Sequence, residues 1–540
     1  MVIDPRIKVA SKLDKQKQKN QHDQAFNSVE DDKNKDSKQN NYTTNEENFS
    51  KKIDTEQSKI IEIHYNVNKS SSKIRLFGHI FFEKYKNQKE LFSLNINSVQ
   101  NELVEFFEFS KRDKHYKVLV IYLIIKKNAE DLSYMFAECH ELNYIVGLEN
   151  LMNESVTNYS NFFLNCSSLK IINNLKECNM ESVTDMNSMF RGCTKLENIL
   201  GISKWKTNKV TNMASMFYAC ENLIELKLDE WNTNNVIYFS GMFYGCSKLQ
   251  SLKTISKFNF SKAVDLSLLF YGCINLEEIP DLSNWDTKNV KSMKGMFYEC
   301  KKIKTIKWIG DISTDDLTDV GSLFYECESL IHLPDIFSKW SMRNIVDISN
   351  LFYGCQNLNL SNFNYDNADL SNVEDISGMF YGCKKLEKID KFFKSNKIKD
   401  TSFLFYECQN LKTLPEKFEF NTDNLTEIKG MFYNCKSLKK VPDLSKWNFD
   451  KVNNLSFMFY GCEKIEIIPE QFNDINFTKD KDISYFIYNC YNLKREKKFF
   501  REGKNEDFKG NRIEIESQLE FSKEAKQSIK IKFENSLVYL

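Results

Sequence analysis

Cysteine is the residue type of this chain whose chemistry and spacing stand out. The chain has 540 residues and 15 cysteines, and all of these except Cys178 recur at steps of 25 to 28 residues. The recurring positions are Cys139, Cys166, Cys193, Cys220, Cys246, Cys273, Cys300, Cys327, Cys355, Cys383, Cys408, Cys435, Cys462 and Cys490. Thiols in such a series could bind a metal, form disulfides, or serve as small buried side chains.

The spacing argues most strongly against a metal site. Metal-binding cysteines lie within a few residues of one another or gather at one point, but the chain has no C-x-x-C, and its six histidines are scattered. Disulfides between neighbouring repeats are conceivable, because cysteine Cα atoms about 5 Å apart can be bridged. However, the number of cysteines is odd, and the lack of a secretory signal favours a reducing compartment. We therefore favour reduced thiols acting as small buried hydrophobic side chains, and we expect no metal site and no cofactor.

The cysteines belong to a longer repeated pattern. Three residues before each cysteine except the last comes phenylalanine, and three residues after it comes leucine or isoleucine. A second aromatic follows about twelve residues after many of the cysteines, as at Trp205 and Trp285. The unit reads approximately V-x-x-M-x-x-M-F-Y-x-C-x-x-L-x-x-I-P-D-L-S-x-W-x. A fixed period of this length is typical of stacked supersecondary units.

One such unit cannot fold alone. About six large apolar side chains are worth roughly 10 kcal/mol when they are buried, whereas ordering about 27 residues costs roughly 30–40 kcal/mol. Neighbouring units must therefore bury each other's apolar faces. This requirement predicts a solenoid whose stability is close to a sum over nearest neighbours.

The repeated unit resembles that of a known family. Its M-F-x-x-C-x-x-L core and P-D-L-S-x-W stretch, found across residues 131–493, are similar to the 26-residue repeat of BspA-like, leucine-rich-repeat-type bacterial surface proteins of the mycoplasma lipoprotein kind. The resemblance implies a leucine-rich-repeat-like fold and a role in adhesion or protein binding; it does not imply an enzymatic activity, and it names no ligand.

From the pattern and the resemblance together we expect an α/β repeat solenoid. It would stack about 14 coils of ~27 residues, each with one short parallel strand and one helical turn, behind a small β-rich N-terminal cap. The strand is expected at the L-x-x-I segment after each cysteine, and the helical turn at the S-x-M-F-Y-x-C segment before it.

Tyrosines form a second column, two residues before the cysteines and beginning at the fourth repeat. They are Tyr218, Tyr244, Tyr271, Tyr298, Tyr325, Tyr353, Tyr381, Tyr406, Tyr433, Tyr460 and Tyr488. An exposed aromatic stripe could anchor a protein partner, since tyrosine is enriched at the residues that dominate interfaces. Alternatively, each ring packs on the ring of the next coil and keeps only its hydroxyl at the rim. The two interpretations are compatible, because a stacked ladder can still present its edges.

The composition argues against nucleic acid as a partner, and the motifs argue against catalysis. Lys and Arg together number 75, as do Asp and Glu, so the net charge is zero and no overall field attracts nucleic acid. The chain has no G-x-x-x-x-G-K-[ST], G-x-S-x-G or H-E-x-x-H motif. Positions that vary between copies carry most of the charge. We expect a partner site there, because the repeated positions are committed to the core.

The sequence favours a location inside the cell. The first 20 residues lack the apolar stretch of about 7–15 residues that a signal peptide requires. The longest apolar run, at residues 118–125, is too short to span a bilayer. A cell-surface location is the alternative that the family resemblance implies.

Four segments follow from these patterns. Residues 1–58 are polar and expected to be disordered. Residues 59–130 alternate like strands, as at Ile61 and Ile63, include a fully buried strand at 118–125, and are expected to form the cap. Residues 131–493 would form the solenoid, and residues 494–540, with alternation at Ile529, Ile531 and Phe533, would form a C-terminal cap.

We expect a non-enzymatic protein–protein interaction scaffold, with a cell-surface adhesin as the alternative. The sequence identifies neither the partner nor the oligomeric state.

Overall fold

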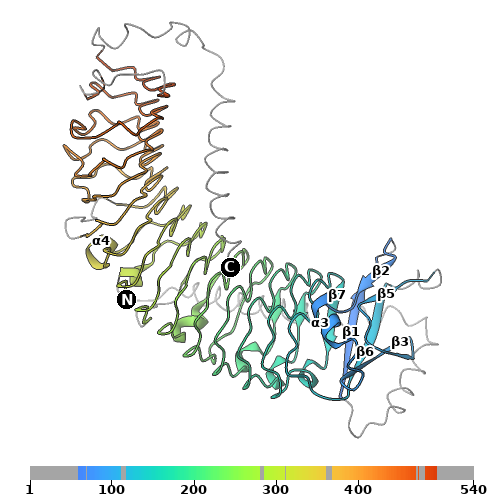
Figure 1. Cartoon of the computed structure of the whole chain (residues 1–540). Coiled ribbons are helices and arrows are strands. Elements are labelled where there is room, and N and C mark those ends of the chain that lie inside the picture. Colours follow the sequence, from blue (N-terminus) through green and yellow to red (C-terminus); the bar gives the residue numbers. More distant parts are fainter. Residues whose placement is uncertain are drawn as a thin grey trace, which may run out of the picture.

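The chain forms a curved array of stacked coils with a small β-rich unit at its N-terminal end (Figure 1). The structure is a computed structural model that describes residues 59–68, 70–110, 117–279, 285–310, 312–360, 368–469, 472 and 481–494. The predicted polar tail at 1–58 lies outside the described residues. So does the predicted C-terminal cap at 494–540, except for Lys494. The predicted repeat solenoid is confirmed.

Over its described residues, the N-terminal unit is an antiparallel sheet with one helix. Its sheet order is β4-β3-β6-β1-β7, and a separate pair joins β2 to β5. The elements are β1 (Lys59–Asn66), β2 (Lys73–Arg75), α3 (His79–Tyr85), β3 (Phe92–Ile96), β4 (Val99–Asn101), β5 (Phe106–Glu108), β6 (Val118–Ile125) and β7 (Leu142–Val146). The prediction of a fully buried strand at 118–125 is wrong, because β6 alternates between buried and partly exposed positions along most of its length. In this strand the residues of one face are therefore buried and most of those of the other face are partly exposed.

The sheet and the first coil share a strand. Strand β7 follows Cys139 and so belongs to the first coil, yet it pairs antiparallel with β1, with Tyr144 opposite His64. The helix α3 approaches the same coil closely. A Cβ atom on Gly78, just before α3, would lie 2.1 Å from the carbonyl oxygen of Tyr134, so only glycine permits this contact. The cap is thus built into the array.

Parallel pairing between coils runs the whole length of the array. The residue eight before each cysteine forms a parallel bridge with its counterpart in the next coil. These residues are Asp131, Asn158, Asp185, Asn212, Tyr238, Asp265, Ser292, Asp319, Asp347, Asp375, Asp400, Glu427, Asn454 and Asp482. The strand predicted after the cysteine is also present, but it is short. Strands β8 (Ile171–Ile172) and β9 (Asn198–Ile199) pair in parallel there, and other coils form single bridges, such as Ser251 with Glu278.

The helical turn predicted before each cysteine is wrong, because the segment is a run of tight turns. In all fourteen coils the residues one and five before the cysteine have a positive φ, for example 55° at Glu299 and 56° at Gly295. Left-handed residues placed every four positions interrupt a helix. They also direct every second backbone N–H group of this segment toward the next coil. The Phe297 N–H, for example, donates to Leu323 O in the next coil (3.0 Å).

The short helices lie after the strand. They are η2 (Leu148–Asn150), η3 (Leu175–Glu177), η4 (Ile202–Lys204), η5 (Lys253–Lys257), η6 (Lys307–Gly310) and α4 (Ile336–Lys339). In α4 the Asp335 carboxylate accepts a hydrogen bond from the Ser338 N–H, as an N-cap does. Helix α4 lies on the outer, convex edge of the array (Figure 1).

Stacked phenylalanine rings form the centre of the core. The rings three residues before the cysteines stack from Phe136 to Phe459 with centroids 5.5–6.0 Å apart. The cap extends this column, because Phe77 stacks on Phe136 at 5.8 Å. The core is therefore continuous from the sheet through the coils.

Candidate interaction surface

Each repeat thiol has a specific hydrogen-bond partner. From Cys166 to Cys490, the Sγ–H donates to the carbonyl of the phenylalanine three residues before the preceding cysteine, at 2.9–3.2 Å. Cys300, for example, donates to Phe270 O at 3.1 Å. Neither alanine nor valine can make this bond. The geometry therefore gives the cysteine column a structural role between coils.

Burial keeps these thiols protonated. It raises the pKa of Cys273 to about 12 and that of Cys490 to about 12. Within the described parts of the chain, every cysteine is a free thiol, and no cluster of three or more His, Cys, Asp or Glu side chains could hold a metal ion. A neutral thiol is a poor nucleophile and a poor metal ligand.

Cys178, the cysteine outside the series, occupies the tryptophan position of its coil. It follows Cys166 by twelve residues, as Trp205 follows Cys193. The Trp205 indole N–H donates to Leu175 O at 3.1 Å. Burial raises the pKa of Cys178 to about 12. The spacing of twelve residues from Cys166 can be read from the sequence, and it indicates that Cys178 packs in the core where other coils place tryptophan.

The tyrosine column is a stacked ladder. Ring centroids from Tyr218 to Tyr460 are 4.0–4.6 Å apart, and the last step, to Tyr488, is 5.4 Å. The Arg191 guanidinium covers the first ring, 4.3 Å from the centroid of Tyr218. Tyr325 is only 2% exposed, and the other rings are buried or half-buried. The ladder presents edges, not faces, and its binding of a partner stays a prediction.

The hydroxyls of the ladder should contribute little to stability. Replacing Tyr325 with Phe keeps the stacked ring and removes only the hydroxyl, which shares hydrogen bonds with the phenols of Tyr298 and Tyr353. We expect the free energy of unfolding to fall by about 1 kcal/mol, measured by urea denaturation. Tyr238→Phe is the control, because Tyr238 lies outside the ladder with 48% of its surface exposed. A loss of several kcal/mol at Tyr325 would show that ring stacking is not the main interaction.

Many surface charges pair one repeat apart. Lys253 binds Glu278 at 2.6 Å, Lys399 binds Glu374 at 2.6 Å, and Lys412 binds Glu387 at 2.7 Å. Exposed pairs of this kind contribute little stability each. They cancel charge locally, so most of the charged surface has no strong preference for a partner of either sign.

Two columns of side chains point outward on one face of the array. They occupy positions eleven and nine before the cysteines from Cys139 to Cys462, and we call them the two-column face. The position between them, as at Val290, is buried. Parts of the face are internally hydrogen-bonded: the Asn289 amide donates to Ser261 O (2.6 Å), and Lys262 donates to Asn235 Oδ1 (2.6 Å).

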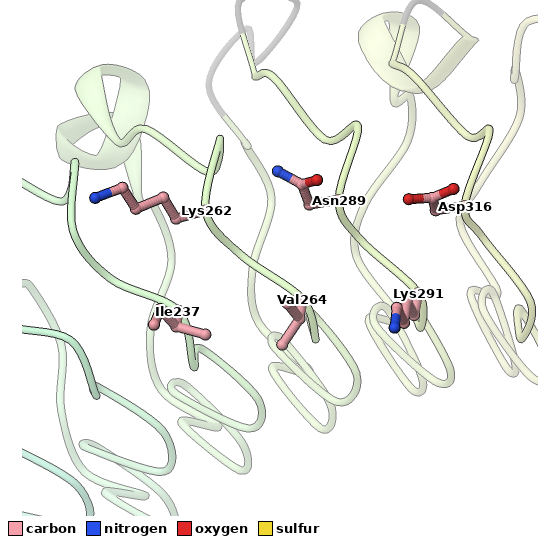
Figure 2. Close-up of a pocket in the computed structure, with 6 residues that line it drawn as sticks. All are labelled: Ile237, Lys262, Val264, Asn289, Lys291 and Asp316. Carbon is pink, nitrogen blue, oxygen red and sulfur yellow. The ribbon is translucent and has the colours of Figure 1, made fainter.

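The two-column face contains a shallow hollow. Figure 2 shows its six lining side chains in two rows contributed by neighbouring coils. One row holds Lys262, Asn289 and Asp316, and the other holds Ile237, Val264 and Lys291. The hollow has a volume of about 520 Å³. Its apolar members are half-buried and its charged members exposed, so it can accept an apolar side chain between polar contacts.

Sequence reasoning predicted a partner site at variable positions but did not single out this hollow. At position nine before the cysteine most coils carry threonine or a charged residue, whereas two neighbouring coils carry Ile237 and Val264. Two adjacent apolar residues at an outward position are the signal that could have found it. Among the described helices, none is long and apolar enough to cross a membrane.

A family model matches this chain over most of the array. The family is described as "Mycoplasma protein of unknown function, DUF285", and it matches residues 130–248, 219–333, 302–418 and 388–500. No curated protein matches the chain. Among solved structures, the crystal structure of a leucine-rich cell surface protein from Faecalibacterium prausnitzii A2-165 matches with 15% identity and a TM-score of 0.31, over 68% of this chain and 88% of that one. At this TM-score the likeness supports no inference about fold or function.

Proposed function

We propose a function from one premise: the chain belongs to the DUF285 family of Mycoplasma proteins of unknown function. The resemblance to mycoplasma-type repeat surface proteins, first noted in the M-F-x-x-C-x-x-L pattern, is thereby confirmed. On that premise we propose a non-enzymatic scaffold that binds a protein partner through the two-column face, with the hollow as the central contact.

One observation supports this site above the rest of the surface. Ile237 and Val264 are apolar side chains in an outward column, next to each other and only half-buried. The repeated Phe, Cys and Leu positions are used in packing between coils, so they are not free to bind. An apolar contact surrounded by exposed charges is the usual anatomy of a small protein interface.

The partner should therefore place an apolar side chain against Ile237 and Val264. Lys291 and Asp316 lie at the edge of this contact, where a polar rim would favour one orientation of the partner. The tyrosine ladder is a weaker candidate, because its rings cover one another. It could extend the contact only through its edges.

An affinity pull-down from the source organism tests the hollow. The variant Ile237→Asp/Val264→Asp places two charges in the proposed contact, and we expect the captured partner to fall by about tenfold or more. Val346→Asp is the matched control, because Val346 holds the same position in another coil and is 42% exposed. Equal loss in both variants, or retention of the partner by the double variant, would contradict the proposed site.

We also propose that the protein acts inside the cell. Thiols that donate to carbonyls, and are not joined to one another, are consistent with a reducing compartment. A cell-surface adhesin is the second candidate, and the family resemblance favours it. Labelling intact cells with an impermeant amine reagent separates the two: labelling equal to that of a known surface protein would support the adhesin and exclude the internal scaffold.

A further inference from the structure

The segment after each cysteine has an outward side, and near the cap this side is apolar. In the first four coils the residue six after the cysteine is buried, whereas the residues four, five and seven after it are exposed or half-buried. Five large apolar side chains at these outward positions are between 36% and 53% exposed. We call them the apolar strip: Tyr144, Val146, Ile171, Leu200 and Ile224.

The apolar strip is continuous across these four coils. Strand β7 of the first coil lies beside β8 of the second, and β8 pairs with β9 of the third through Ile171 and Asn198. In the fourth coil the Ile224 N–H donates to Glu197 O of the third at 3.4 Å. The five side chains therefore lie on one surface and not at separate points.

The same positions are polar or charged in later coils. In the coils of Cys246 and Cys300 they hold Gln250, Ser251, Lys253, Lys304, Thr305 and Lys307. A contiguous group of exposed apolar side chains with polar surroundings is typical of a protein interaction site. The strip is thus a candidate interface at a different place from the hollow, whose lining residues lie before the cysteines.

The cap fixes one end of the strip. The His64 ring contacts the Tyr144 ring edge-on, with centroids 5.7 Å apart. Glu62 Oε1 in turn lies 2.6 Å from His64 Nε2. A contact surface that is ordered before it binds loses less conformational entropy on binding.

Two opposite charges lie in the middle coils of the strip. Lys170 and Glu197 are both four residues after a cysteine, and the Glu197 N–H donates to Lys170 O at 2.8 Å. Both side chains are exposed, and neither forms an ion pair with a described residue. Glu387 and Lys412 hold the same position in two later coils, but they pair with each other at 2.7 Å.

A second copy of the chain matches this arrangement of charges. A two-fold axis parallel to the strands, between the coils of Cys166 and Cys193, would place Lys170 of each copy opposite Glu197 of the other. Such an isologous contact makes every interaction twice. The same axis would place Tyr144 of each copy opposite Ile224 of the other, because each lies one coil outside the central pair.

An anionic membrane surface is a poorer match for the strip. The strip carries the carboxylates of Glu197 and Glu225 beside its apolar side chains, and an anionic surface attracts clusters of lysine and arginine instead. A self-complementary pair of charges favours a second copy.

We propose that the chain forms a two-fold dimer in which the apolar strips of two copies pack face to face, with Lys170 of each copy paired to Glu197 of the other. The dimer leaves the hollow free, so it is independent of the proposed partner site.

Sedimentation velocity on the full-length protein across the micromolar range tests the dimer. Ile171→Asp should raise the dissociation constant of the dimer by about tenfold or more. Ile331→Asp is the matched control and should leave it unchanged, because Ile331 is 41% exposed at the same kind of position in another coil. Amide protection at Phe297, in the middle of the array, reports that each variant is folded.

A charge exchange tests the two-fold arrangement. Lys170→Glu alone places two carboxylates opposite each other at both ends of the contact, and it should weaken the dimer by about tenfold. The double variant Lys170→Glu/Glu197→Lys should restore the dimer, because each new charge again faces its opposite in the other copy.

Four results would overturn the proposal. They are a monomer at every concentration, a dimer that Ile171→Asp leaves intact, an equal loss in Ile331→Asp, and a charge exchange that fails to restore the dimer. A monomer that binds anionic vesicles through the strip would identify a membrane as the occupant in place of a second copy.

Discussion

Raising the pH from about 8 to about 10.5 is expected to lower the free energy of unfolding of the array by many kcal/mol and to unfold it. The cause is the column of buried thiols. Burial raises the pKa of Cys273 to about 12, and it raises the pKa of the other repeat cysteines as well, as at Cys300 and Cys355. An unfolded thiol has a pKa close to 9.0.

The direction of this change in the free energy of unfolding follows from the number of protons that the folded and unfolded states bind. Below pH 9 both the folded and the unfolded thiol are protonated, and the stability is fully present. Between pH 9 and about 12 the unfolded chain loses its thiol protons while the folded array keeps them, so unfolding is favoured by about 1 kcal/mol per pH unit for each such thiol. The buried tyrosines add to the effect above pH 10, since burial also raises the pKa of Tyr353 to about 12.

Urea denaturation at a series of pH values measures this loss. The urea midpoint should be constant up to about pH 8 and fall steeply above 9. A variant in which Cys273, Cys300 and Cys327 are replaced with Ala should show a shallower fall, because three titrating groups are gone. A midpoint that does not move between pH 8 and pH 10 would contradict the buried-thiol interpretation.

Replacing Phe297 with Ala is expected to lower the free energy of unfolding of the coils around it by about 3–5 kcal/mol. The ring is fully buried. It stacks on Phe270 at 5.5 Å and on Phe324 at 5.9 Å, so its removal opens a cavity against both neighbouring coils. Because stability in a repeat array is a sum over neighbouring contacts, the loss concentrates in the middle of the array. Native-state hydrogen exchange should show local opening there before the ends are affected.

Lys291→Ala provides the control for Phe297→Ala, because Lys291 lies in the same coil with its side chain exposed. It should change the stability by less than about 0.5 kcal/mol. Similar effects of the two substitutions would mean that the core positions of the coil are assigned wrongly.

The sequence predicted the repeat unit, its core columns and the stacking of coils, since Phe297, Cys300 and Ile303 recur at fixed offsets. It did not predict the form of the segment before the cysteine. Residues such as Gly295 and Glu299 turn their N–H groups toward the next coil only once a next coil exists, and a local pattern read as a helix carries no information about that neighbour. The thiol bond from Cys300 to Phe270 O was hidden for the same reason, because its acceptor is a backbone carbonyl in another coil.

The hollow was also beyond the sequence prediction. Ile237 and Val264 become neighbours only when the register of two coils is fixed, and that register is set by the parallel bridge between Tyr238 and Asp265. A period read from one chain gives the spacing along the sequence but not which outward side chains come together across the stack.

The bridge eight residues before each cysteine also limits how this molecule can change in length. The nine residues from that bridge to the cysteine are the same number in all fourteen coils, although the cysteines are 25 to 28 residues apart. Small insertions and deletions must therefore be accommodated in the outer part of the coil, as in the one that contains α4. A whole coil, in contrast, uses the same backbone positions as its neighbours: its N–H groups donate to the next coil, and its carbonyls accept from the preceding one. It can be duplicated or lost as a unit, so the reach of the array can change while the chemistry of every junction is preserved.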